Sequence, residues 1–178
     1  MIDAAGRLFA KRGYHGTSMR KLGKELGLVG SSLYSHVGSK EELLVEVVRH
    51  GAALFEGSVD KARAGGGDGA SQLRNLITGH LDVVLDNRDA ASTYLNEASV
   101  LDADHRNQVR AERNRYEQAF RDVYDLGAKD GSLPLSADSK LAAIFTLSVL
   151  NAVPRWYRPL GPLDRNDLAE AIFSFVTR

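Results

Sequence analysis

The stretch from Thr17 to Leu44 reads TSMRKLGKELGLVGSSLYSHVGSKEELL, and its pattern decides the fold. Thr17 and Ser18 are residue types that cap helices, and the apolar residues after them recur at helical spacing as far as Gly27. A tight turn follows, and residues 30–36 are expected to form another short helix. Two short helices joined by such a turn, and braced by a third helix, are typical of a helix-turn-helix.

The residues on either side of this turn also follow the 3.6-residue period of an α-helix. Before it, the apolar residues from Ile2 to Phe9 predict a helix that Gly13 stops. After it, Ser39 and Glu42 form a capping box, in which a serine hydroxyl and a glutamate three residues later satisfy free backbone N–H groups. This box is expected to open a long fourth helix.

Five more helices are expected beyond the flexible glycine-rich link of residues 65–69. Their periodic apolar residues cover the ranges 73–85, 89–100, 109–123, 141–153 and 168–176. Ser136 and Asp164 are the expected caps of the last two helices. The 141–153 segment is apolar on nearly all sides, so we expect neighbours to cover it all round and residues 155–162 to break it. Nine helices without a convincing strand make the fold class all-α.

Composition places the chain among soluble globular proteins. It has 178 residues, of which 43% are hydrophobic and 26% charged, and no cysteine. The lack of cysteine excludes a disulfide framework and thiolate metal sites. The longest apolar stretch, Leu141 to Val153, is too short to span a bilayer, and the N-terminal segment lacks the pattern of a signal peptide. We therefore expect a cytoplasmic protein without a membrane partner.

The formal net charge of zero conceals an uneven distribution of charge along the chain. Residues 1–50 carry eight Lys or Arg against five Asp or Glu, whereas residues 51–178 carry 15 against 18. A basic end on a mildly acidic body suits a protein whose one end meets a polyanion. The asymmetry is small, so it supports DNA binding only in combination with the helix-turn-helix pattern.

The residues of the second helix in the pair suit a DNA major groove. A helix that enters the groove needs a slim surface with hydrogen-bonding groups. Small residues let the backbone approach, and hydroxyl and imidazole groups can face base edges. The residues concerned are Val29, Gly30, Ser31, Ser32, Tyr34, Ser35 and His36. A three-helix bundle with a serine-rich corner would show the same periodicity, so the pattern alone leaves both interpretations open.

The run from Ala4 to Leu44 resembles the DNA-binding segment of the tetracycline-repressor (TetR) family. The matching positions are Ala4-Ala-Gly-Arg-Leu-Phe-Ala, Gly13-Tyr-His-Gly-Thr17-Ser-Met, Leu22-Gly, Leu26-Gly-Leu and Ser32-Leu-Tyr34-Ser-His36-Val-Gly-Ser39-Lys40-Glu-Glu-Leu-Leu. The resemblance implies nine or ten helices, a homodimer formed through the last two, and an effector pocket in the body. Residues 1–46 would then be the helix-turn-helix DNA-binding domain, and residues 47–178 the effector-binding and dimerisation domain.

The resemblance also implies which residues meet the operator, a double-stranded DNA partner. Thr17, Tyr34 and Lys40 match positions that usually hold phosphates, although a solvated lysine is the alternative for Lys40. The full candidate set is Thr17, Ser18, Val29, Gly30, Ser31, Ser32, Tyr34, Ser35, His36 and Lys40. Two positions depart from the family pattern. Val29 replaces a frequent Ser or Thr cap, and Val37 replaces a frequent Phe, so the core there is smaller or is filled by another residue.

The candidates for binding a small effector are aromatic and arginine residues of the body. They are Tyr94, Tyr116, Phe120, Phe145, Arg155, Trp156 and Arg158. The segment Trp156-Tyr-Arg-Pro resembles a stretch in TetR-type regulators of fatty-acid and steroid catabolism, which respond to acyl-coenzyme A thioesters. This resemblance implies a repressor that such a thioester releases from its operator. The alternatives are a helix terminator at the dimer seam, and an efflux repressor with a neutral or cationic aromatic effector. His80 fits a core histidine with satisfied nitrogens better than an effector contact.

An enzyme and a helical adaptor are the competing classes of function. The sequence has no Gly-x-Ser-x-Gly nucleophile elbow, no His-Glu-x-x-His pair and no Walker loop. We therefore expect no catalytic residue and no cofactor. Asp102, Asp104 and His105 could suggest a metal, but acidic residues are common at a helix start, so no metal site is expected. An adaptor would not bind duplex DNA, which separates it from a regulator.

Overall fold

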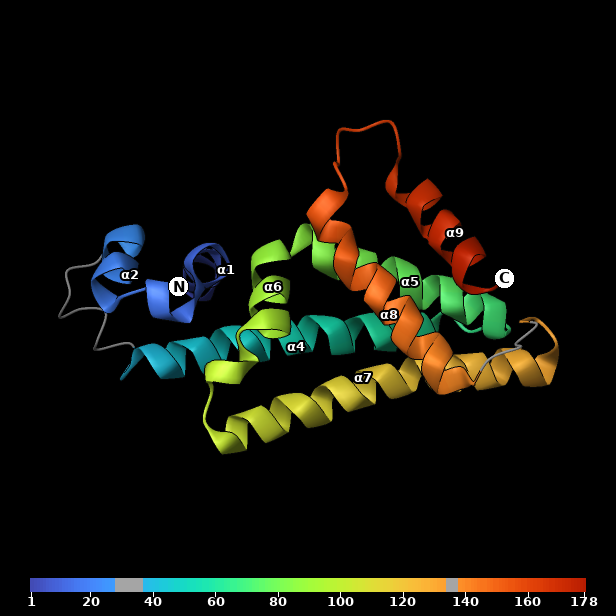
Figure 1. Cartoon of the computed structure of the whole chain (residues 1–178), viewed down its shortest axis with the longest axis horizontal. Coiled ribbons are helices and arrows are strands. Elements are labelled where there is room, and N and C mark those ends of the chain that lie inside the picture. Colours follow the sequence, from blue (N-terminus) through green and yellow to red (C-terminus); the bar gives the residue numbers. More distant parts are fainter. Residues whose placement is uncertain (28–36, 134–137) are drawn as a thin grey trace. The chain divides into compact units, whose positions relative to one another are not determined.

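The computed structural model describes residues 1–27, 37–133 and 138–178, and the secondary structure in these ranges is entirely helical (Figure 1). These ranges contain eight α-helices and one 3-10 helix. They are α1 (Ile2–Gly16), α2 (Met19–Leu26), α4 (Lys40–Ala64), α5 (Gly69–Asp86), α6 (Arg88–Asn96), η1 (Ala98–Val100), α7 (Ala103–Asp130), α8 (Ser139–Trp156) and α9 (Arg165–Val176). The all-α prediction is confirmed. The helix expected over residues 30–36 and the cap expected at Ser136 lie outside the described residues.

The chain separates into two compact units, each built from segments that are distant in sequence. The first unit combines Met1–Leu54 with Asn87–Ala111, and the second combines Phe55–Asp86 with Glu112–Arg178. Two long helices, α4 and α7, therefore contribute residues to both units. No helix in the described part of the chain is long and apolar enough to cross a membrane.

In the first unit, α1 and α4 approach α6 closely through glycines. A Cβ atom on Gly6 of α1 would lie 3.5 Å from Val47 Cγ1 and 3.8 Å from the backbone nitrogen of Ala90. A Cβ atom on Gly51 of α4 would lie 2.7 Å from the Cβ of Tyr94 on α6. The absence of a side chain at Gly51 thus lets α4 and α6 pack closely, with Tyr94 buried.

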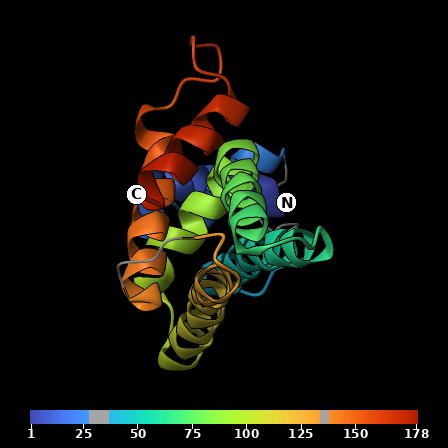
Figure 2. The same ribbon diagram turned by 90° about the vertical axis from the view of Figure 1, so that its right-hand side faces the viewer.

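In the second unit, α5 packs against both α8 and α9, and α8 and α9 also contact each other, as Figure 2 shows. The core contains large side chains from all of these helices and from α7. It includes Leu73, Leu76, Ile77, Leu81, Phe120, Tyr124, Leu150, Val153, Leu168 and Ile172. The Tyr124 hydroxyl lies 2.6 Å from the Thr146 hydroxyl inside this core, so the phenol is buried with a hydrogen-bond partner.

Several helix boundaries confirm the sequence prediction and others correct it. Ser18 caps α2 by accepting a hydrogen bond from the backbone N–H of Lys21, and Asp164 caps α9. Gly13 interrupts the first helix as expected, since its backbone is non-helical, with φ 67° and ψ 168°. Beyond this kink a short second helical segment continues α1 to Gly16. A glycine without a Cβ atom adopts this φ without strain, so the chain turns and resumes helical geometry.

Helix α8 differs from the expectation in its end and in its exposure. α8 begins after the cap residue Asp138 and continues through Pro154 to Trp156. The proline lies in the last turn, where the backbone N–H of Tyr157 still bonds to the carbonyl of Val153 and closes the helix. α8 is also not covered all round in the isolated chain, since Leu141 is 47% exposed and Phe145 61% exposed.

Candidate DNA-binding corner and effector site

The Lys40 side chain joins the end of α1 to the start of α4. Its Nζ donates hydrogen bonds to the backbone oxygens of Tyr14 and Thr17, each at 2.9 Å, and lies 3.9 Å from the centre of the Tyr14 ring. Carbonyls at a helix C-terminus attract a cation, and an aromatic face adds to this attraction. An ammonium group has three N–H donors, so these two bonds leave one donor for a further acceptor.

The capping box that begins α4 determines where Lys40 lies. Ser39 Oγ accepts a hydrogen bond from the backbone N–H of Glu42 at 3.0 Å. Glu42 Oε2 in turn accepts from the backbone N–H of Gly38 at 2.9 Å, one residue earlier than in the usual box. The predicted box is confirmed, and it holds the first turn of α4 beside the C-terminus of α1.

The other candidate DNA-binding residues fall into three groups. Thr17 is only 1% exposed, and its hydroxyl lies 2.9 Å from the Gly13 carbonyl oxygen, so it faces inward. Ser18 is exposed at the start of α2. The remaining candidates, Val29, Gly30, Ser31, Ser32, Tyr34, Ser35 and His36, lie outside the described residues.

The excess of positive charge near the N-terminus does not by itself show where the basic side chains lie. In the structure, many of these side chains are exposed on α1 and α2. They are Arg7, Lys11, Arg12, Arg20, Lys21 and Lys24. The spacing of the basic residues along the two helices could have predicted which of them share a face. It does not show which of these side chains remain exposed once neighbouring helices pack against α1 and α2.

An aromatic cluster with a polar centre lies in the second unit, where α4, α5 and α7 meet. The ring of His80 on α5 lies 5.2 Å from that of Phe55 on α4 and 5.8 Å from that of Tyr116 on α7. Phe120 lies 5.5 Å from Tyr116. His80 Nδ1 is 3.1 Å from the Tyr116 hydroxyl, which is also 3.5 Å from Ser58 Oγ. The cluster thus places hydrogen-bonding groups among apolar rings.

His80 is held in its neutral form. Burial lowers the pKa of His80 from 6.5 to about 3, because charging the ring there would require removing a cation from water, and the nearby side chain of Asn151 offsets this only in part. His80 Nε2 and Asn151 Oδ1 are both buried, and the Asn151 side chain lies close enough to the ring to act as its hydrogen-bond partner. The ring is thus in the core as expected, with the Tyr116 hydroxyl at its Nδ1.

The structure does not bring all of the candidate effector residues together. Tyr116 and Phe120 belong to the aromatic cluster of the second unit, whereas Tyr94 lies in the first unit against Gly51. Phe145 and Trp156 are exposed on α8 at 61% and 51%. Regularly spaced aromatic residues predict helices, but they do not show which aromatic residue faces which neighbour.

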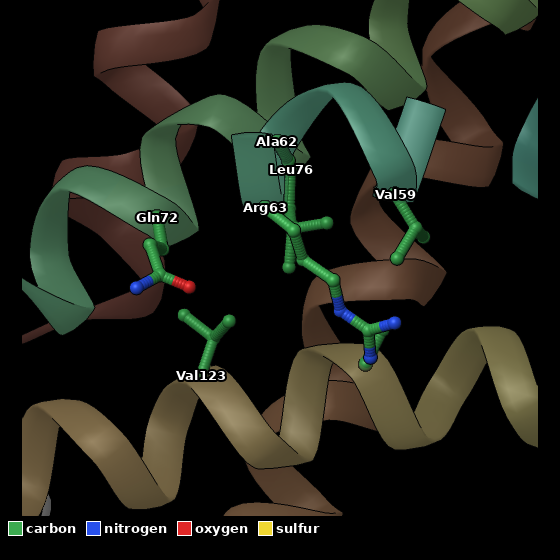
Figure 3. A pocket seen from close by; sticks show the side chains of 7 residues that line it. Val59, Ala62, Arg63, Gln72, Leu76 and Val123 are labelled. Atoms are coloured by element: carbon green, nitrogen blue, oxygen red, sulfur yellow. The ribbon is translucent and has the colours of Figure 1, made fainter. Parts of the chain in front are cut away.

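A small hollow lies between α4, α5 and α7. In Figure 3, Arg63 extends from α4 toward α7, and Val123 of α7 points toward Gln72 of α5. Its volume is about 10 Å³, which is about enough for one water molecule. Arg63 lies 3.8 Å from Asp122, so its charge already has a partner. The hollow as it stands would not hold a coenzyme-sized ligand.

The arginines at the end of α8 differ from other arginines of the second unit. Five arginines of this unit pair with carboxylates: Arg63, Arg74, Arg115, Arg121 and Arg165. Arg155 and Arg158 are exposed and have no carboxylate within ion-pair distance in the described ranges. Trp156 lies between them in sequence and packs edge-on against the buried Tyr157 at 6.4 Å. Two unpaired cations thus flank an exposed indole.

A capped α2 with exposed cations, together with a second unit whose described residues are all helical, is the arrangement expected of a helical DNA-binding regulator. Residues 1–47 match the bacterial regulatory proteins of the tetR family, and residues 66–178 match the tetracyclin repressor-like C-terminal domain. The chain therefore belongs to the TetR family, whose members are DNA-binding regulators of transcription.

Individual relatives resemble the chain over almost its whole length. The HTH-type transcriptional repressor KstR2 of Rhodococcus jostii (strain RHA1) is 30% identical over 177 residues, which cover 99% of this chain and 87% of KstR2. The structure of the regulator PfmR from Thermus thermophilus has 31% identity and a TM-score of 0.88, covering 99% of this chain and 96% of PfmR. AibR, solved with isovaleryl coenzyme A and operator DNA, shares the fold at 23% identity, a TM-score of 0.88 and coverages of 99% and 95%.

We predict that His80 makes the protein less stable as the pH falls below about 6.5. The ring takes up a proton near pH 6.5 in the unfolded chain but only near pH 3 in the folded chain. Between these values only the unfolded state binds the proton, so the free energy of unfolding falls by about 1.4 kcal/mol per pH unit. Urea unfolding at about pH 7, 6 and 5 should show that His80→Phe loses this part of the slope. The control His50→Phe should keep it, and equal slopes in all three proteins would contradict a neutral His80.

We also predict that Lys40 contacts a DNA phosphate. Lys40→Met should weaken binding to duplex DNA of any sequence, because phosphate contacts carry no sequence information. The slope of log binding constant against log salt should fall in size by about 0.9 for each lost contact. Lys129→Met, which changes an exposed lysine of the second unit, is the control and should leave the slope unchanged. If Lys40→Met also leaves it unchanged, Lys40 has only the structural contacts to Tyr14 and Thr17.

Proposed function

We propose that this chain is a transcriptional repressor that binds operator DNA as a homodimer and leaves it when an acyl-coenzyme A thioester binds the body. It acts in the cytoplasm and without catalysis. Membership of the TetR family and likeness to the repressor KstR2 support the DNA-binding part. The observation that carries the effector class is the pair of unpaired arginines beside the exposed Trp156. AibR, in a structure with isovaleryl coenzyme A, indicates that this fold can accept a ligand of that kind.

The proposed dimer forms through the exposed apolar faces of α8 and α9. Leu141 and Phe145 lie one turn apart on α8, and Phe175 of α9 is 68% exposed. Large apolar side chains gathered on neighbouring helices are unusual on a monomer surface. A two-fold pairing covers the same face on both copies and closes the assembly, whereas an unsymmetrical contact would extend into fibres.

The proposed site for the charged end of the effector is at Arg155, Trp156 and Arg158. Guanidinium groups donate paired hydrogen bonds to phosphate oxygens, and an indole face can stack on a planar base. A coenzyme A thioester carries both phosphates and a base. A cationic drug would be repelled by two unpaired arginines, which favours the anionic effector over an efflux-type effector.

Release from DNA requires that the effector prefers one arrangement of the dimer. A ligand with equal affinity for two states shifts neither population. A two-fold dimer engages two half-sites when its DNA-binding ends are about 34 Å apart, one turn of the duplex. We propose that the effector favours an arrangement with a different spacing, transmitted through α4, which contributes residues to both units.

The dimer is tested by placing charges on the proposed interface. The double variant Phe145→Glu with Phe175→Glu should be a monomer in sedimentation at micromolar concentration, because two carboxylates per chain would be buried unpaired. The wild type should be a dimer. Leu160→Glu changes a fully exposed apolar residue in the loop between α8 and α9, and it should remain a dimer. A monomeric wild type, or a dimeric double variant, would exclude this interface.

The effector class is tested by titrating protein bound to its own promoter DNA with isovaleryl-, palmitoyl- and steroid-coenzyme A thioesters. At least one thioester should release the wild type. Arg155→Ala with Arg158→Ala should bind DNA as before but need at least about tenfold more effector, since charge-assisted hydrogen bonds are lost. Arg115→Ala removes an arginine that is paired with Glu56 and should respond as the wild type does. If no thioester releases the wild type, or the double variant responds identically, the proposed effector site is wrong.

A further inference from the structure

A carboxylate connects the end of α6 to the kink in α1. Glu97, the residue at which α6 ends, accepts a hydrogen bond from the backbone N–H of Tyr14 at 3.0 Å through its Oε2. The two residues are 83 positions apart in sequence, and both belong to the first unit. Because α1 and α6 also pack against each other, this bond fixes the place where their ends meet.

The kink explains why Tyr14 takes a partner from outside its own helix. Gly13 is non-helical, with φ 67° and ψ 168°, so a new helical segment begins at Tyr14. The first backbone N–H groups of a helical segment have no acceptor within it. Glu97 supplies that acceptor. A Cβ atom on Gly13 would lie 3.7 Å from Glu97 Oε1, so the carboxylate sits directly against the kink.

The segment that Glu97 anchors carries the acceptors for Lys40. Nζ of Lys40 donates to the backbone oxygens of Tyr14 and Thr17, each at 2.9 Å, and lies 3.9 Å from the centre of the Tyr14 ring. The N–H of Tyr14 is thus held by Glu97, while its carbonyl and its ring hold the lysine. A displacement of Tyr14 therefore changes where Lys40 directs its remaining N–H donor.

The other bond at the kink does not replace Glu97. The Thr17 hydroxyl donates to the Gly13 carbonyl at 2.9 Å, which closes the short segment from within. This bond preserves the local shape of α1, but it does not connect the segment to another helix. The bond of Glu97 does, because it comes from the end of α6.

We propose that Glu97 is a positioning residue for DNA binding, which acts by holding Tyr14 where Lys40 can reach a phosphate. The inference rests on the proposed function, in which Lys40 contacts DNA, and it adds a residue of α6 that has no DNA contact of its own. The role requires a hydrogen-bond acceptor and not a negative charge, so an amide oxygen should also serve. The charge by itself would only repel the DNA phosphates.

The test measures binding of the full chain to a duplex containing its own promoter. Glu97→Ala should bind roughly fivefold more weakly than the wild type, as expected for one lost hydrogen bond, whereas Glu97→Gln should stay within about twofold. Hydrogen exchange of the Tyr14 amide should become faster in Glu97→Ala and stay slow in Glu97→Gln. Glu46→Ala, which removes an exposed glutamate that pairs with Arg49, is the control and should change neither measurement.

A double-mutant cycle distinguishes positioning of Lys40 from a general loss of structure. In the Lys40→Met background, Glu97→Ala should cause no further loss of DNA affinity, because its effect passes through the lysine. If Glu97→Ala fails to fold, Glu97→Asp replaces it, since the shorter side chain keeps the charge but loses the reach.

Three results would overturn the proposal: additive losses in the cycle, unchanged DNA affinity of Glu97→Ala, or a Glu97→Gln variant as weak as Glu97→Ala. A wild type that does not bind the duplex would contradict the proposed function and this inference together. Wild-type binding that depends on Lys40 but not on Glu97 would contradict the inference alone.

Discussion

The contact between Gly69 and Gly127 controls the packing of the second unit. A Cβ atom on Gly69 would lie 2.3 Å from the Cα of Gly127, so the start of α5 touches the backbone of α7 directly. The backbone N–H of Gly69 also donates to Asp130 at 2.9 Å, which fixes the first turn of α5. Once α5 begins there, its later turns place His80 against Tyr116. The aromatic cluster and its polar centre therefore depend on two residues without side chains.

Local signals in the sequence were sufficient to predict where most helices begin. A cap such as Ser18 or Asp164 acts through hydrogen bonds within three residues, so its effect is visible in the sequence itself. The end of α8 at Pro154 was harder to predict. Whether a proline ends a helix depends on how many backbone hydrogen bonds of the helix follow it. The prediction that α8 is covered on all sides was wrong for the isolated chain. A helix face that packs into the core and one that stays exposed can have the same apolar composition, so composition does not distinguish them.

The candidate site was predicted less completely than the fold, because it depends on contacts between distant residues. The sequence marked Tyr116 as an effector candidate and placed His80 in the core, but it could not show that the two share a hydrogen bond. The position of Asn151 beside that ring depends on how α8 packs on α5. Likewise, a count of arginines does not reveal that Arg155 and Arg158 have no carboxylate partner in the described ranges.

The ion pairs between α5 and α9 have a consequence for the rotation of α9 about its own axis. Arg165 bonds to Asp82 and Asp86 of α5, while Arg74 of α5 bonds to Glu170 and covers the Phe173 ring at 3.7 Å. Exposed pairs of this kind contribute only about 0–1 kcal/mol each. They reinforce the orientation of α9 that the burial of Leu168, Ile172 and Phe173 already favours. Each residue turns a helix by about 100°, so a rotated α9 would bury Phe175 and expose Phe173. The ion pairs and the apolar contacts of α9 thus favour the same orientation, which leaves Phe175 outside.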